Sequence, residues 1–329
     1  MKKYSVAIFG SSLRSNFDKY SDKDLIVIAQ SYKELSRLQK KYESQGFSVS
    51  LYTYKKLQYL SDIGNLFVQH LKKESSILID YDNILQKLLS EHKETSPTSE
   101  QVLESIIFFN LVKYVPDTPL GYAWFCDCFY VGIRNYLILQ SAIKLDFNFS
   151  FLDLINELLK NNIINKSDYE ILRQLRVLKK NYRDRINEEY PSKKFIVSLE
   201  EIGYKLNLLD SVNFVDRKGF IDFFKNKISK DDINHYFKLR LLEIYYLLLG
   251  KRIREIDKII CNPQFYALKF KDMGFIETLI KSIDKKNDPQ HGFWYWAKLS
   301  NKSNSSVYNK DLWSPENEVH LIPNVIPSP

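Results

Sequence analysis

The sequence predicts an α+β protein in which a small mixed-sheet domain precedes a mostly α-helical domain. Short apolar runs bounded by turn residues lie before residue 80, as expected for the buried strands of a sheet. Beyond about residue 97, apolar residues recur at helical spacing with little interruption. Only 10 glycines and 10 prolines occur in 329 residues, which favours long helices over a turn-rich β fold.

Four segments are expected to form the sheet. Residues 4–9 and 25–29 are continuous apolar runs, which are typical of buried strands. Along residues 47–54, apolar and more polar side chains alternate strictly, so that the two sets should face opposite sides of a strand. Residues 76–80 are expected to form a further short strand.

Helices are expected between the strands and throughout the second half of the chain. Within the sheet domain the spacing predicts helices at 31–45 and 55–74. The polar, proline-containing segment 91–99 is expected to be a linker. The helices expected after it are about 100–114, 119–145, 151–160, 166–189, 198–210, 217–228, 230–259 and 264–283.

These elements divide the chain into three expected parts. Residues 1–92 form the sheet domain and residues 97–284 form the helical domain. Residues 285–329 are a tail that has aromatic residues but no periodicity, and this tail either wraps around the body or is flexible.

Composition restricts the compartment and the partners. A net charge of +8 favours an anionic partner such as a nucleotide, a nucleic acid or an anionic lipid surface. The 3 cysteines lack the spacing of a zinc site, and their odd number does not suggest a disulfide framework. These cysteines favour a reducing, cytoplasmic setting. No apolar stretch is long enough to span a membrane, so we expect a soluble protein.

The N-terminal segments carry the chemistry. Residues 10–12, Gly-Ser-Ser, lie where the first strand should turn into a helix, and there a glycine, a hydroxyl and backbone N–H groups can hold a phosphate. Asp22 and Asp24 are two residues apart at the entry to the second strand, so both carboxylates should leave the same face. Carboxylate oxygens are suitable ligands for Mg²⁺.

Together, residues 9–14 (Phe-Gly-Ser-Ser-Leu-Arg) and 21–27 (Ser-Asp-Lys-Asp-Leu-Ile-Val) resemble the polymerase-β-like nucleotidyltransferase superfamily. The resemblance is to its minimal members that carry a helical C-terminal domain, and it covers residues 4–90. The residues that match the family pattern are Gly10, Ser11, Arg14, Asp22 and Asp24. Ser15 departs from it, because many minimal members have glycine at that position.

The resemblance implies Mg²⁺-dependent (or Mn²⁺-dependent) transfer of a nucleoside monophosphate from an NTP or dNTP to an acceptor. Asp22 and Asp24 would be catalytic and would hold the metal. The residues implied in nucleotide binding are Gly10, Ser11, Ser12 and Arg14. The family usually has a third carboxylate on the next core strand, where this chain offers Ser48 and Ser50. The chain is therefore either an enzyme with two aspartate ligands, which we favour, or a degenerate module that only binds nucleotide or nucleic acid.

The acceptor stays open at this point. The basic helical domain favours a nucleic-acid 3′ end. A protein hydroxyl is the alternative, as in NMPylating, antitoxin-like relatives that act in toxin control or antiphage (antiviral) defence. An aminoglycoside-type small molecule fits a basic chain less well, because such substrates are cations.

Further charged residues lie in the predicted helices. Arg173, Arg176, Lys180 and Arg183 share one face of the helix 166–189, which is either a solvated face or a track for the phosphates or the acceptor.

Three other polar residues lie within predicted helices. His70 and Glu74 are spaced i, i+4, and we expect a local hydrogen bond between them rather than a metal site. Arg134, in an otherwise apolar helix, is expected to pair with an acid such as Asp127; the alternative is that it points into the cleft between the domains.

Overall fold

The computed structural model describes residues 3–14, 23–186, 190–228 and 235–261, which fall into two compact units divided after Asp216. The boundary expected near residues 92–97 lies inside the first unit, and the expected C-terminal tail lies outside the described residues. The expected α+β class with a small mixed sheet is confirmed.

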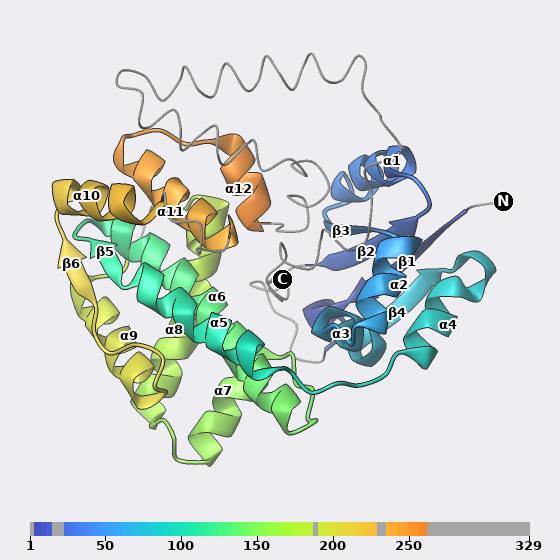
Figure 1. Ribbon diagram of the computed structural model, residues 1–329, viewed down its shortest axis with the longest axis horizontal. Coiled ribbons are helices and arrows are strands. Elements are labelled where there is room, and N and C mark those ends of the chain that lie inside the picture. The colour runs from blue at the N-terminus through green and yellow to red at the C-terminus, as the bar shows by residue number, and fades with distance from the viewer. Residues whose placement is uncertain (1–2, 15–22, 187–189, 229–234, 262–329) are drawn as a thin grey trace. The chain divides into compact units, whose positions relative to one another are not determined.

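The sheet has the strand order β3-β2-β1-β4, in which β1 runs antiparallel to both neighbours and β2 runs parallel to β3 (Figure 1). Its strands are β1 Tyr4–Phe9, β2 Asp24–Ala29, β3 Ser48–Thr53 and β4 Ser75–Ile79. All four expected strands are therefore present within a residue or two of the predicted bounds. The central strands β1 and β2 are buried almost throughout, which explains why their sequences are continuous apolar runs.

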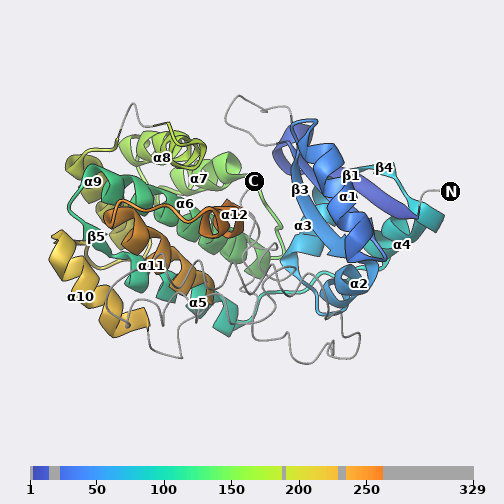
Figure 2. The ribbon, with the colours of Figure 1, turned by 90° about the horizontal axis from the view of Figure 1, so that it is seen from above.

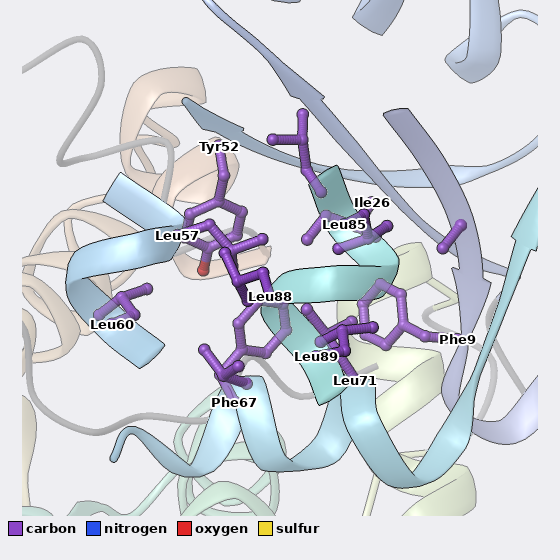
Figure 3. Packing of buried hydrophobic residues seen from close by; sticks show 13 residues of the cluster. Phe9, Ile26, Tyr52, Leu57, Leu60, Phe67, Leu71, Leu85, Leu88 and Leu89 are labelled. Carbon is purple, nitrogen blue, oxygen red and sulfur yellow. The ribbon is translucent and has the colours of Figure 1, made fainter. Parts of the chain in front are cut away.

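One face of the sheet packs against three helices and forms the core shown in Figure 3. Alternate strand residues such as Phe9, Ile26 and Tyr52 meet Leu57 and Phe67 there. The helices are α2 Tyr54–Asp62, α3 Leu66–Glu74 and α4 Ile84–Glu91; the short 3-10 turns are η1 Gly10–Leu13 and η2 Tyr81–Asn83. Because successive strand residues face opposite ways, the intervening residues lie on the other face, where α1 Tyr32–Glu43 packs. Each fully buried side chain of this size stabilises the fold by about 1.5–3 kcal/mol.

The single helix expected at 55–74 is wrong, because the structure divides it into α2 and α3. Gly64 has φ +67°, a left-handed conformation that an α-helix does not continue through. The side chain of Asn65 then caps α3 by accepting a hydrogen bond from the N–H of Phe67 at 2.9 Å. The break therefore turns α3 into a separate element that begins at its own cap.

The expected linker lacks regular structure over residues 92–98, yet its side chains are attached to the sheet domain. His92 Nδ1 lies 3.1 Å from the hydroxyl oxygen of Ser61, and the hydroxyl of Thr95 donates to the carbonyl of Gly64 at 2.8 Å. Local polarity predicted an irregular segment but did not reveal this attachment.

The rest of the first unit is helical, as predicted, with α6 at its centre, where it packs against α5, α8 and α9 (Figures 1 and 2). Its helices are α5 Ser99–Val112, α6 Pro119–Ile143, α7 Phe151–Lys160, α8 Lys166–Asp184 and α9 Lys193–Lys205. A short parallel pair, β5 Tyr114–Pro116 with β6 Asn213–Val215, was not predicted, because three residues are too few for a pattern.

Several helix ends differ from prediction for local reasons. Helix α8 ends at Asp184 because Arg185 has φ +63°, and α9 begins early because the hydroxyl of Ser192 caps it. In the second unit, the expected helix 230–259 is interrupted near Gly250, at φ +71°. That unit contains α10 Arg217–Ile228, α11 His235–Leu248 and α12 Arg254–Cys261. The helix expected at 264–283 lies outside the described residues.

Within the described ranges, no helix combines the length and the apolar character needed to cross a membrane.

Candidate active site

The expected phosphate loop and a carboxylate meet at the end of β1. Phe9, the last residue of β1, pairs in register with Asp24, the first residue of β2. Gly10 follows with φ +75°, and a Cβ atom on it would lie 3.5 Å from Oδ2 of Asp24. A buried glycine turn therefore adjoins a carboxylate that is only 5% exposed. Both belong to the sequence motif that predicted the site.

The two serines of β3 lie where a third carboxylate was expected. Ser48 pairs with Asp24 and Ser50 pairs with Ile26 in the parallel register. Because Tyr52 and Ile26 both enter the same core, alternation places Ser48 and Ser50 on the face of the sheet that carries Asp24. The positions next to Asp24 on this strand therefore offer hydroxyl groups instead of an acid.

A metal site formed by both motif aspartates lies partly outside the described residues, because Asp22 is among those not described. In the described ranges, no three histidine, cysteine or acidic side chains gather closely enough to hold a metal ion. Asp24 has the oxygen chemistry that Mg²⁺ prefers and lies beside the glycine turn, so the described residues fit one ligand of such a site.

Glu74 of α3 connects the phosphate loop to the helix behind it. Its Oε2 atom accepts a hydrogen bond from Nε2 of His70 at 3.1 Å and another from Nη2 of Arg14. The expected local hydrogen bond between His70 and Glu74 is thus confirmed. Arg14, expected to support the loop or the phosphates, is held by this carboxylate.

The protonation states in this cluster follow from burial and hydrogen bonding. Burial lowers the pKa of His70, which favours the neutral ring, although Glu74 opposes this shift. Burial raises the pKa of Glu74, but hydrogen bonds and charges from His70 and Arg14 outweigh it and lower that pKa to about 2. Glu74 is therefore ionised at neutral pH and offers Arg14 a full negative charge.

The expected pairing of Arg134 with Asp127 is wrong. Asp127 instead accepts a hydrogen bond from Nε of Arg183, on α8, at 2.6 Å. Arg134, on α6, is 1% exposed, and its Nη2 atom donates to the carbonyl of Phe149 at 3.4 Å. Burial lowers the pKa of Arg134, and so does the charge of Arg14, whereas Tyr130 and the charges of Asp24 and Glu74 partly oppose this shift. The electrostatic field of the candidate site therefore reaches Arg134.

Phe149, in the loop between α6 and α7, was not singled out from the sequence. Its ring stacks on that of His70 with centroids 4.5 Å apart, and its carbonyl accepts the hydrogen bond of Arg134. Close by, Nζ of Lys73 donates to the carbonyl of Phe147 at 2.7 Å. This loop therefore joins α6 to α3, and an aromatic residue in a polar loop was the available sequence signal.

The basic residues expected to form a phosphate track are mostly paired with acids. Arg173 lies 3.1 Å from Glu170 and Lys180 lies 3.3 Å from Asp184, both on exposed or half-buried surface of α8. Arg183 pairs with the buried Asp127, and both Arg183 and Arg176 are half-buried. Acidic side chains of the protein thus already pair with arginine and lysine side chains that could otherwise bind nucleic-acid phosphates.

No family model, curated protein or solved structure matches the chain.

Proposed function

We propose that this protein is a Mg²⁺-dependent nucleotidyltransferase that moves a nucleoside monophosphate from an NTP or dNTP to an acceptor and releases pyrophosphate. One observation carries the proposal. Gly10, in a left-handed turn after a buried strand, lies directly beside the Asp24 carboxylate, so a phosphate cradle and a metal-type ligand adjoin.

Each group has a role that its chemistry supports. The N–H groups and hydroxyls of residues 10–12 would hold the phosphates of the bound nucleotide. Asp24, together with Asp22, would hold Mg²⁺ (or Mn²⁺), which when bound supplies charge neutralisation for the transferred phosphoryl group. Arg14 would be oriented by Glu74, which fixes the end of the phosphate loop.

The acceptor that we favour is a nucleic-acid 3′ end, supported by the net charge of +8. A protein hydroxyl is the second candidate, and antiphage defence or toxin control is the cellular role that we propose for either reaction. Ser48 and Ser50 motivate the different-class alternative, a module that binds nucleotide without transfer, because they stand where a third acid was expected.

A labelling experiment tests the proposal. The protein is incubated with each α-labelled NTP and dNTP and Mg²⁺, with and without cellular RNA, and the labelled species is identified. Label in polynucleotide supports the favoured acceptor, label in protein supports the second, and bound but untransferred nucleotide supports the binding module.

Variants connect the label to the site. Asp22→Ala combined with Asp24→Ala should lower transfer more than about 100-fold, because even residues that only support metal ligands change activity 10–100-fold. Asp62→Asn removes an exposed acid of the same domain and is the matched control. Equal transfer by the double variant and the unmodified protein contradicts the proposal.

A further inference from the structure

We infer that Arg134 is the anion-binding residue that helix α6 contributes to the nucleotide site, where its guanidinium contacts the polyphosphate of the substrate. This inference rests on the proposed function and names the part of the substrate that the residue recognises. The sequence motif, which ends before residue 30, does not include it.

Burying the charge of Arg134 costs free energy. Arg134 is 1% exposed on α6. A guanidinium remains charged in proteins, and its transfer out of water costs several kcal/mol unless an anion and hydrogen bonds compensate. Such a residue is therefore expected to have an anionic partner.

Within the described part of the protein, no acidic side chain forms a hydrogen bond with Arg134. Arg134 has five N–H donors, yet its hydrogen bond to the Phe149 carbonyl is long, at 3.4 Å. Its Nη1 atom is buried and has no hydrogen-bond partner among the described residues. Donor capacity therefore remains for a ligand.

The guanidinium of Arg134 lies near the candidate site. The charges of Arg14, Asp24 and Glu74 all influence it, and Phe149 connects it to His70, whose ring lies close to Gly10. Arg134 is thus close to the residues expected to hold phosphates and metal, although it comes from a different part of the chain.

The two arginines of the site, Arg14 and Arg134, differ in their partners. Arg14 is already held by Glu74, so its charge is balanced within the protein. Arg134 is not balanced in this way, and its planar fork can contact two oxygens of one phosphate. A polyphosphate, with its high charge density, fits this requirement better than a neutral base or a sugar.

Inorganic triphosphate is the appropriate probe, because the base is not identified and no transfer is needed for the measurement. Binding in the presence of Mg²⁺ is measured by calorimetry for the full chain and for Arg134→Met, Arg134→Lys and Lys205→Gln. Lys205 is the control, since it pairs with Asp168 at 2.7 Å in the same helical region.

We expect Arg134→Met to weaken triphosphate binding at least about 10-fold, since charge-assisted bidentate hydrogen bonds are lost. Arg134→Lys should bind with intermediate affinity, because the charge is kept but the planar fork is lost. Lys205→Gln should bind like the unmodified protein.

Urea unfolding of the same proteins separates ligand binding from a structural role. Met fills a similar volume without a buried charge, so Arg134→Met should be at least as stable as the unmodified protein. A structural role alone predicts lower stability with unchanged triphosphate affinity. If Arg134→Met does not fold, its stability prediction is contradicted and Arg134→Lys carries the binding test.

Two failures are distinguishable. If the unmodified protein binds triphosphate and Arg134→Met binds it equally well, the inference about Arg134 is overturned while the proposed function stands. If the unmodified protein does not bind triphosphate at all, both are overturned.

Discussion

Helix α6 carries two buried charged residues, Asp127 and Arg134, that have different kinds of partner. Asp127, near the middle of the helical region, is paired with Arg183 of α8 at 2.6 Å. Arg134, about two turns further along α6, has a single long hydrogen bond to a carbonyl within the described residues. Both side chains are almost completely buried, so solvent does not explain the difference.

The matched charge lies where two helices pack together, and the unmatched charge lies where we propose that a ligand binds. A charge matched inside the fold fixes the packing of two helices, and removing one partner leaves the other uncompensated. An unmatched buried charge has a cost in the absence of ligand, and such costs are concentrated at functional sites.

The largest expected effect is at the matched pair. Asp127→Ala should lower the free energy of unfolding by about 3–5 kcal/mol, because it leaves Arg183, whose side chain is only 10% exposed, without this carboxylate. Urea unfolding measures the loss. Glu170→Ala, which removes an exposed partner of Arg173, should cost at most about 1 kcal/mol. Equal losses in the two variants would remove the contrast between buried and exposed pairs.

The next effect concerns the glycine turn of the site. Gly10→Ala should cost about 1–2 kcal/mol of stability, since alanine is strained at φ +75° although its Cβ meets no atom closer than 3.5 Å. It should also weaken triphosphate binding in calorimetry. Gly46→Ala is the control, at φ +84° with open space around the Cβ. A similar stability cost with no binding change is expected there, and parallel binding losses in both would contradict a phosphate role for Gly10.

The smallest effect is electrostatic and depends on pH. The pKa of Glu74 is lowered to about 2, so its stabilising contribution is complete above its ordinary pKa and is lost as pH falls toward 2. With partial exposure taken into account, Glu74→Gln should cost about 1 kcal/mol near pH 7. Urea unfolding at pH 7 and pH 3 should show this gap shrinking on the acid side. The exposed Glu91→Gln serves as the control, and a gap of constant size would contradict the assignment.

Much of the sheet domain could be predicted because its signals are local. Continuous apolar runs indicated β1 and β2, strict alternation indicated β3, and residues 9–12 indicated the glycine turn after β1. The break at Gly64 was missed, since apolar spacing continues across it and only the left-handed conformation reveals it.

The partners of the charged residues could not be predicted in the same way. Spacing along one helix correctly joined His70 to Glu74, because residues four apart share a face. The need of a buried arginine for an acid suggested Asp127 as the partner of Arg134, whereas Asp127 is bound by a residue 56 positions away. Any acid on any packed element can compensate a buried arginine, so sequence alone leaves the choice open.

By itself, the sequence determined the order of the strands along the chain, the helical character of the second half, and the phosphate-loop and carboxylate motif. These features depend on the conformational preferences of neighbouring residues and on the periodicity of helices and strands. The tertiary structure alone sets the contacts of Glu74 with Arg14, of Phe149 with His70, and of Arg134 with the Phe149 carbonyl. Those relations join elements far apart in the chain, and packing of the whole first unit, rather than any local preference, brings them together.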